Sequence, residues 1–172
     1  ARMGNPMDLE TQIGPVANLP HYNKVLGYID IAKSEGAATR LGGHRAQGAE
    51  YGDGLFIEPT IFTGVNNRMR IAQEEVFGPV VVVSKAVDFG AALHEANDSQ
   101  WGLQAGVFTN DWRKARQAFH ALEVGGVVVN DAPSFRADAQ PYGGVKGSGL
   151  GREGLRSAMA DFTEERTLVW RP

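Results

Sequence analysis

The chain has 172 residues, enough for a domain of ordinary size that buries roughly two-thirds of its unfolded surface. Its 42% hydrophobic and 22% charged residues exclude a disordered or collagen-like chain, and a formal net charge of -3 without a dense basic block argues against nucleic acid as a partner. No cysteine is present, which excludes disulfides, thiolate metal ligands and thiol nucleophiles from this sequence.

The sequence shows no signal of a membrane or metal protein. No apolar run reaches the roughly 18 residues that a membrane helix needs, and residues 1–10 lack the basic and then apolar pattern of a signal peptide. The four histidines are scattered without metal-ligand spacing, so we expect surface histidines and no metal site. The expected location is the cytoplasm, with no membrane partner.

Hydrophobic periodicity predicts the elements of the first part of the chain. Between Asn18 and Gly36, apolar residues recur every three or four positions, which predicts an amphipathic helix that ends at a glycine. Residues 37–43 are expected to form a short strand. A polar, glycine-rich loop follows at 42–54, and a second strand is expected near 55–62.

Strands and helices alternate in the second part of the chain. The run Val80–Val83 is short, β-branched and wholly apolar, which predicts a strand covered on both faces in a parallel sheet. A helix over 88–97 with its N-cap at the first residue, a strand at 105–109, a helix at 110–122 and a strand at 126–130 follow. The inward faces of the two helices are expected to be Phe89, Ala92, Leu93 and Ala96, and then Ala115, Ala118, Phe119 and Leu122. This order predicts an α/β fold with a mostly parallel open sheet and flanking helices.

The last part of the chain is dominated by a long loop. Residues 131–154 are rich in glycine, proline and serine, and a stretch of this length is too long for a plain connector, so we expect a functional or packing loop. A last helix is expected at 155–162 and a last strand at 167–171. No further strand follows that could pair with it, so we expect this strand to pair outside its own domain.

Two acidic residues precede the strand at Val80–Val83. Neighbouring side chains of an extended segment point in opposite directions, so one carboxylate of Glu74-Glu75 is expected to face solvent and the other the edge of the sheet. An acceptor-only carboxylate there suits the paired hydroxyls of a ribose. Taken alone, the segment is better explained as a solvated acidic turn.

Glycines cluster again near the end of the long loop. The stretch Pro141–Gly149 carries Lys146, which is expected either to hold an anionic partner or to bond loop carbonyls. The spacing of a phosphate-binding P-loop is absent.

Together these motifs resemble the carboxy-terminal part of the NAD(P)-dependent aldehyde dehydrogenase superfamily. The resemblance covers essentially all of the chain. It is carried by Gly4-Asn5-Pro6, Ile13-Gly14-Pro15, Phe56–Thr60, Glu74–Pro79, Ala96-Asn97 with Gly102-Leu103, Val107-Phe108-Thr109, Val129-Asn130, and Pro141–Gly144 with Lys146 and Ser148-Gly149.

The resemblance implies a fold and an incomplete catalytic apparatus. Residues 1–162 are expected to form part of the catalytic domain, and 163–172 an oligomerisation strand of a homo-oligomer. Family members oxidise an aldehyde to a carboxylic acid with NAD or NADP. Ahead of the matched region they carry a Rossmann-like cofactor domain, a glutamate general base and a cysteine nucleophile. None of these is present here, so no catalytic residue is expected in this chain, which is predicted to be inactive and to bind no cofactor tightly on its own.

The resemblance also assigns candidate binding residues. Glu75 matches the glutamate that hydrogen-bonds the ribose beside the nicotinamide, and Phe77 the aromatic residue that packs against that sugar and ring. Glu74 is expected to face away, and Asn130 to be structural.

The loop at 131–142 corresponds to the substrate entrance of the family. Phe135, Arg136 and Tyr142 are therefore candidate substrate-binding residues. Arg136 is expected to favour a small anionic or hydroxylated aldehyde, because a guanidinium binds carboxylate and similar groups bidentately. A structural ion pair of Arg136 with Asp138 or Asp131 is the alternative.

Two other readings of the whole chain remain open at this point. One is a free-standing truncated dehydrogenase-like protein that binds or oligomerises without catalysis. The other is a mononucleotide-binding module, which the absent glycine fingerprint makes the weaker of the two.

Overall fold

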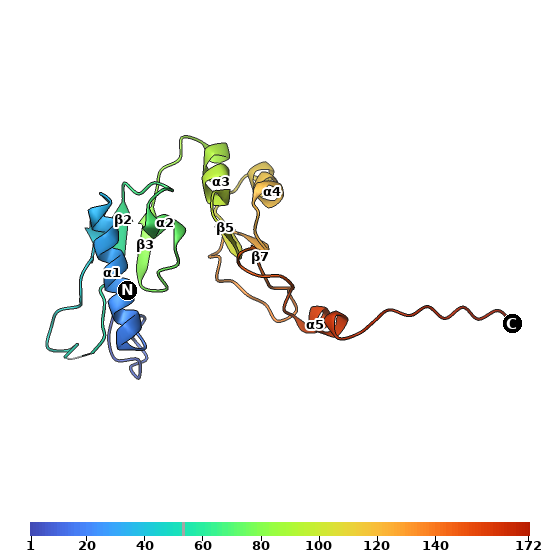
Figure 1. The fold of residues 1–172 in the computed structure, drawn as a ribbon, viewed down its shortest axis with the longest axis horizontal. Helices are drawn as coiled ribbons and strands as arrows, with labels where there is room; N and C mark the ends of the chain where they lie inside the picture. Colours follow the sequence, from blue (N-terminus) through green and yellow to red (C-terminus); the bar gives the residue numbers. More distant parts are fainter. Residues whose placement is uncertain (53) are drawn as a thin grey trace. The chain divides into compact units, whose positions relative to one another are not determined.

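The computed structural model describes residues 1–52 and 54–172. The chain divides into two compact units, Ala1–Lys85 and Ala86–Pro172. Figure 1 shows the elements of both units in sequence colours. The predicted boundary at residue 162 stays a prediction.

The first unit contains two helices and a three-stranded sheet. Its elements are α1 (Leu19–Ser34), β1 (Ala38–Leu41), β2 (Thr60–Thr63), α2 (Arg70–Gln73) and β3 (Val80–Val83). The predicted first helix is confirmed: the Asn18 side chain caps it by accepting from the His21 N–H at 2.9 Å, and it ends before Gly36, whose φ is 96°.

The sheet of the first unit has the order β1-β2-β3, with β1 antiparallel and β3 parallel to β2. The predicted strand at 55–62 is shorter, since Pro59 has no N–H to donate to a ladder. The predicted loop at 42–54 includes residue 53, which lies outside the described residues.

One face of this sheet packs on the buried side of α1 (Figure 1). The core is formed by Tyr22, Val25, Ile29, Ala32, Ala37, Ile57, Phe62, Val65 and Ile71. Val80 and Val82 pack against this core, whereas Val81 is 58% exposed. The prediction that β3 is covered on both faces is therefore wrong within this unit, because β3 is the edge strand and the helix covers a single face.

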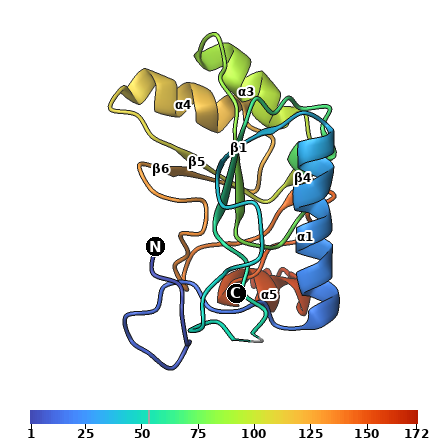
Figure 2. The ribbon, with the colours of Figure 1, turned by 90° about the vertical axis from the view of Figure 1, so that its left-hand side faces the viewer.

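The second unit contains three helices and two small sheets. Its elements are α3 (Phe89–Asn97), β4 (Trp101–Gly102), β5 (Gln104–Val107), α4 (Trp112–Ala121), β6 (Gly126–Val129), β7 (Val145–Lys146) and α5 (Leu155–Asp161). The predicted N-cap Asp88 accepts from the Ala91 N–H at 2.7 Å. Helices α3 and α4 contact each other (Figure 2).

The core of this unit is small. Leu93, Val107, Ala118 and Leu122 form it. Phe119, predicted to face inward, is 66% exposed, and Ala96 is also exposed. These two expectations are wrong. Adjacent helical residues are about 100° apart, so burying Ala118 turns Phe119 away from the single layer that covers α4.

The predicted α/β class is confirmed, and its parallel pairings are β2 with β3 and β5 with β6. They belong to separate sheets, and a third, two-residue antiparallel pairing joins β4 to β7. Strand β7 lies inside the stretch predicted as a loop without regular structure. Among the described helices none is long and apolar enough to cross a bilayer.

The end of the chain departs most from expectation. Helix α5 confirms the predicted helix, but residues 163–172 form no strand and follow α5 as an extended run (Figure 1). Leu168, Val169 and Trp170 are exposed. A strand needs a neighbouring ladder to satisfy its N–H and C=O groups, and within this chain the segment pairs with none of the described strands.

Candidate functional site

The first candidate region is the turn that joins α2 to β3, residues 74–78. Glu74 ends α2 with an extended backbone, φ -109° and ψ 146°, and its N–H donates to the Arg70 carbonyl at 2.8 Å. Gly78 lies directly against α1. A Cβ at this position would be 2.7 Å from Cγ2 of the fully buried Val25, so the close approach requires glycine.

The side chain of Glu74 is tied into the fold. Its carboxylate accepts two hydrogen bonds from the guanidinium of Arg70, at 2.7 and 2.8 Å, and one from the Tyr28 hydroxyl at 2.7 Å. The bonds from Arg70 and then from Tyr28 lower the pKa of Glu74 to about 2. The hydrogen bond to the carboxylate raises the pKa of Tyr28.

Glu75 has the opposite character. Its side chain is exposed, and its carboxylate makes no hydrogen bond or ion pair with any described residue. Its backbone is held, since the carbonyl accepts from Lys24 Nζ at 3.0 Å. A carboxylate that is anchored by its backbone and free at its oxygens can accept hydrogen bonds from the hydroxyls of a ligand.

Phe77 presents an exposed aromatic ring from a constrained backbone. Phe77 is 74% exposed as a residue, and it has a φ of 56°, which is unfavourable for a bulky side chain. The His21 Nε2–H donates to the Phe77 carbonyl at 2.5 Å, and the two rings meet edge to face with centroids 5.9 Å apart. The turn therefore offers an unpaired carboxylate and an uncovered ring, both from a fixed backbone.

The second candidate region is the loop 131–142 in the second unit. Arg136 forms an ion pair with Glu153 and lies over the ring of Tyr142, with its Cζ 4.4 Å from the ring centroid. The backbones of Tyr142 and Glu153 pair through hydrogen bonds of 3.1 and 2.5 Å. A structural ion pair of Arg136 is therefore present, but the partner expected from the sequence, Asp138 or Asp131, is wrong.

Phe135 and Asn130 are the other two residues of this part of the chain to which the resemblance gave a role. The half-exposed Phe135 is attached through its carbonyl, which accepts from Gln104 Nε2 at 2.8 Å. Asn130 has a φ of 61°, and its side chain accepts from the Thr109 N–H at 2.8 Å. Its contacts are those of a structural residue, as predicted. The structure thus brings Arg136 and Tyr142 into contact and holds Phe135 through its carbonyl.

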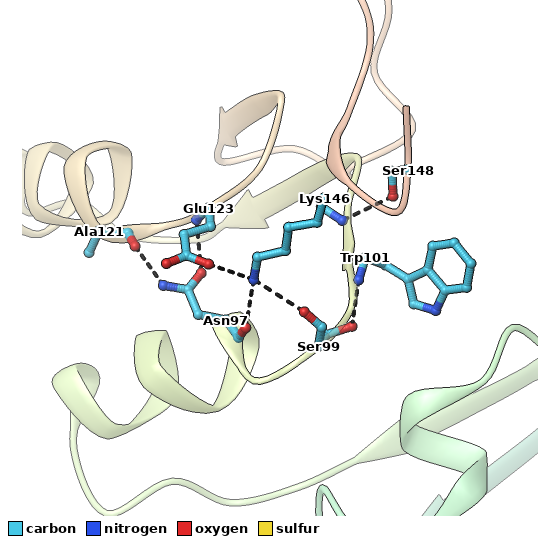
Figure 3. A network of polar contacts seen from close by, with 8 residues as sticks. Asn97, Ser99, Trp101, Ala121, Glu123, Lys146 and Ser148 are labelled. Carbon is cyan, nitrogen blue, oxygen red and sulfur yellow. Dashed lines mark hydrogen bonds and ion pairs between the residues drawn. The ribbon is translucent and has the colours of Figure 1, made fainter. Parts of the chain in front are cut away.

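Lys146 proves to be a structural residue (Figure 3). Its Nζ donates to the carbonyls of Asn97 at 2.7 Å and Ser99 at 3.2 Å, and pairs with the Glu123 carboxylate at 2.6 Å. The Asn97 side chain extends the network by donating to the Ala121 carbonyl and accepting from the Glu123 N–H. Of the two predicted roles, bonding of loop carbonyls is confirmed. The lysine joins the long loop to the ends of α3 and α4.

The sequence motifs did not predict four residues that contact the turn: His21, Lys24, Tyr28 and Arg70. The first three are spaced three and four residues apart on α1, which places them on one face of the helix. The spacing of these three residues predicts that they share one face of α1. The sequence does not predict that this face contacts the turn 74–78, because the turn lies tens of residues further along the chain. Among the described residues no group of three or more His, Asp or Glu side chains is placed to hold a metal ion.

The fold is that of an α/β protein, and comparison with known sequences gives its family. The aldehyde dehydrogenase family matches residues 1–168. The 3-sulfolactaldehyde dehydrogenase of Priestia megaterium is 46% identical over 167 residues, which cover 97% of this chain and 34% of that protein. The betaine aldehyde dehydrogenase of Mesorhizobium japonicum is 41% identical over 167 residues, with the same two shares.

Solved structures of aldehyde dehydrogenases are also similar to this chain. Aldehyde dehydrogenase 21 from Physcomitrella patens, in complex with the reaction product succinate, is 42% identical with a TM-score of 0.90, over 99% of this chain and 34% of that one. Betaine aldehyde dehydrogenase from Staphylococcus aureus in complex with NAD+ is 41% identical with a TM-score of 0.88, over 94% and 32%. The chain belongs to the aldehyde dehydrogenase family, and it spans about a third of the length of these relatives.

Proposed function

We propose that this chain is part of an NAD-dependent aldehyde dehydrogenase that oxidises an aldehyde to a carboxylic acid. The observation that carries the proposal is the turn 74–78, whose carboxylate and aromatic ring are both exposed on a fixed backbone. Family membership supplies the reaction class. The part of the reaction that we propose for this chain is to position the nicotinamide end of the cofactor, and the exposed carboxylate and ring of the turn support this.

The residues of the turn fit the cofactor chemically. Two neighbouring ribose hydroxyls are donors, and the Glu75 carboxylate has acceptor positions without partners among the described residues. The ring of Phe77 offers an apolar face against which the ribose and nicotinamide pack. The nicotinamide, when bound, would supply the hydride acceptor for the oxidation of the aldehyde. NAD rather than NADP is proposed because the solved S. aureus relative is in complex with NAD+.

For the substrate we propose a short anionic aldehyde, with Arg136 as the residue that recognises the charge and Phe135 and Tyr142 beside it. The Arg136 side chain is 52% exposed, so a face of the guanidinium stays open although Glu153 occupies another. The P. megaterium relative is a 3-sulfolactaldehyde dehydrogenase, whose substrate carries a sulfonate, and the P. patens structure holds succinate.

The isolated chain is proposed to be inactive, since it contains no cysteine to attack an aldehyde, and it is also proposed to bind NAD weakly. The whole protein is proposed to be cytoplasmic and homo-oligomeric. The second point is supported by the exposed, unpaired segment 163–172, which contains Leu168, Val169 and Trp170. Light scattering at several concentrations tests it: a dimer or larger species is expected, and deletion of residues 167–172 should shift it toward monomer. A monomer at every concentration would refute this part.

The direct test uses the full-length dehydrogenase that contains this chain, with the Glu75→Gln and Phe77→Leu variants. Both should raise the KM for NAD or slow hydride transfer in a single turnover, while thermal unfolding stays unchanged because both side chains are exposed. The isolated chain, assayed with NAD, NADP and a panel of aldehydes, should reduce no nucleotide above the blank. Normal cofactor kinetics in both variants would exclude the assignment of the turn.

A further inference from the structure

Helix α1 reaches the candidate cofactor turn through three side chains on one face. His21 donates to the Phe77 carbonyl at 2.5 Å, Lys24 to the Glu75 carbonyl at 3.0 Å, and Tyr28 to the Glu74 carboxylate at 2.7 Å. Two of these contacts hold the backbone. The third holds a side chain, the Glu74 carboxylate, which also accepts two hydrogen bonds from Arg70 on the preceding helix α2.

The anchored Glu74 side chain sets the direction of its neighbour. Glu74 is extended, and successive side chains of an extended segment point to opposite sides. Because the fork of Arg70 and the hydroxyl of Tyr28 draw the Glu74 carboxylate toward α1, the Glu75 carboxylate is directed away from the helix. The exposure of Glu75 and the partial burial of Glu74 agree with this arrangement.

We propose that Glu74 is a positioning residue for cofactor binding: through Arg70 and Tyr28 it fixes the turn so that the Glu75 carboxylate faces the ribose. This inference rests on the proposed role of Glu75. Without the anchor, two adjacent carboxylates compete for the same two donors, and a flip of the turn would tie down Glu75 and expose Glu74.

The charge of the anchor is stable under working conditions. The hydrogen bonds from Arg70 and Tyr28 lower the pKa of Glu74 to about 2, so the carboxylate stays ionised and paired well below neutral pH. A bidentate pair between a guanidinium and a carboxylate also restricts orientation more than a single contact does. The same geometry is therefore presented to the cofactor throughout the pH range of an ordinary assay.

The test uses the full-length dehydrogenase with the Glu74→Gln and Tyr28→Phe variants, NAD as the probe, and the aldehyde that corresponds to succinate as substrate. Glu74→Gln should lower kcat/KM for NAD about tenfold, and Tyr28→Phe about threefold, while the KM for the aldehyde stays unchanged. In a Glu75→Gln background, Glu74→Gln should add less than about twofold, because a residue that acts only through Glu75 has nothing left to position.

Two controls separate positioning from general stability. Asp8→Asn removes another ion pair of the same unit, with Arg2 at 3.3 Å, and should leave NAD kinetics unchanged. Arg70→Lys keeps the charge and loses the fork, so it should fall between wild type and Glu74→Gln. Thermal unfolding is measured for every variant. If Glu74→Gln fails to fold, Tyr28→Phe, which keeps the ring in place, decides the matter.

The possible failures are distinguishable. If Glu75→Gln alone leaves NAD kinetics unchanged, the proposed function of the turn falls, and this inference with it. If Glu75→Gln impairs NAD kinetics but Glu74→Gln and Tyr28→Phe do not, only the positioning role is refuted. Equal losses from Glu74→Gln in the wild-type and Glu75→Gln backgrounds, with a lowered unfolding temperature, would likewise show that Glu74 serves stability rather than Glu75.

Discussion

The turn 74–78 and the loop 131–142 carry the two sets of candidate binding residues, and they offer them in opposite ways. In the turn, the backbone is held by α1 and the Glu75 carboxylate is free of described partners. In the loop, the Arg136 guanidinium already pairs with Glu153 and stacks on Tyr142. A ligand at the turn can bind the Glu75 carboxylate directly. A ligand at the loop must share the Arg136 guanidinium with Glu153 or displace Glu153. The type of a residue alone therefore does not show whether its side chain is free to bind a ligand.

One glycine of the turn 74–78 and one that packs on the long loop 131–154 differ in how little room they leave for a side chain. At Gly125, which precedes β6 in the second unit, a Cβ would lie 1.6 Å from the Gly143 carbonyl oxygen of the long loop. At Gly78 the nearest atom, 2.7 Å away, belongs to the Val25 side chain. Backbone cannot rotate aside as a side chain can, so Gly125 is the less tolerant of the two.

The largest expected effect follows from this packing. Gly125→Ala should lower the free energy of unfolding on the order of 3 kcal/mol, and Gly78→Ala by about 1–2 kcal/mol. Gly27→Ala is the matched control: it lies within α1 with no atom near its added Cβ, and should stabilise by about 0.5–1 kcal/mol. Urea unfolding of the chain measures all three. Equal losses of unfolding free energy in Gly125→Ala and Gly78→Ala would contradict the expected difference between the two positions.

The second-largest expected effect concerns the guanidinium of Arg136, which is already paired with Glu153. In the full-length dehydrogenase, Arg136→Leu should lower kcat/KM for an anionic aldehyde about 30-fold, or about 2 kcal/mol, the scale of a charge-assisted hydrogen bond, and barely change it for acetaldehyde. The ratio of the two kcat/KM values is the readout. Equal losses on both aldehydes would instead assign Arg136 wholly to the structural pair with Glu153.

Glu153→Gln sharpens the same question with a smaller effect. It removes the charge that competes for Arg136, so the KM for an anionic aldehyde should fall by about two- to threefold, the scale of an exposed ion pair. The KM for acetaldehyde should not change. A rise in KM for both aldehydes would mean that the pair is needed to hold the loop, and that no competition exists.

The smallest effect concerns the pH dependence of the turn. The pKa of Glu74 is lowered from 4.5 to about 2, so its contribution to stability is complete above about 4.5 and is lost as the pH falls toward 2. The urea midpoints of wild type and Glu74→Gln should therefore differ most near neutral pH, approach each other below pH 4.5 and converge only as the pH falls to about 2. Gly27→Ala, which changes no titratable group, serves as control. A midpoint difference that is independent of pH would contradict the anchored carboxylate.

Local patterns in the sequence determined the elements and their caps. The spacing of Tyr22, Val25 and Ile29 predicts the buried face of α1, and Asn18 and Asp88 cap the helices that they were expected to begin. These features act over three or four residues, so the sequence is sufficient to predict them. The exposed pair Glu75 and Phe77 was found through a short motif, which is equally local.

Tertiary structure decided which candidate groups have partners. The Glu74 carboxylate meets Tyr28 across 46 residues and Arg136 meets Glu153 across 17, and neither pairing follows from spacing. Similarly, Phe119 and the outer face of β3 are exposed because each unit covers its elements from one side only, although their sequences are as apolar as buried ones. Composition and period set what a segment can bury. Which surface covers a segment, and which charged group pairs with its side chains, depends on how segments that are distant in sequence pack together.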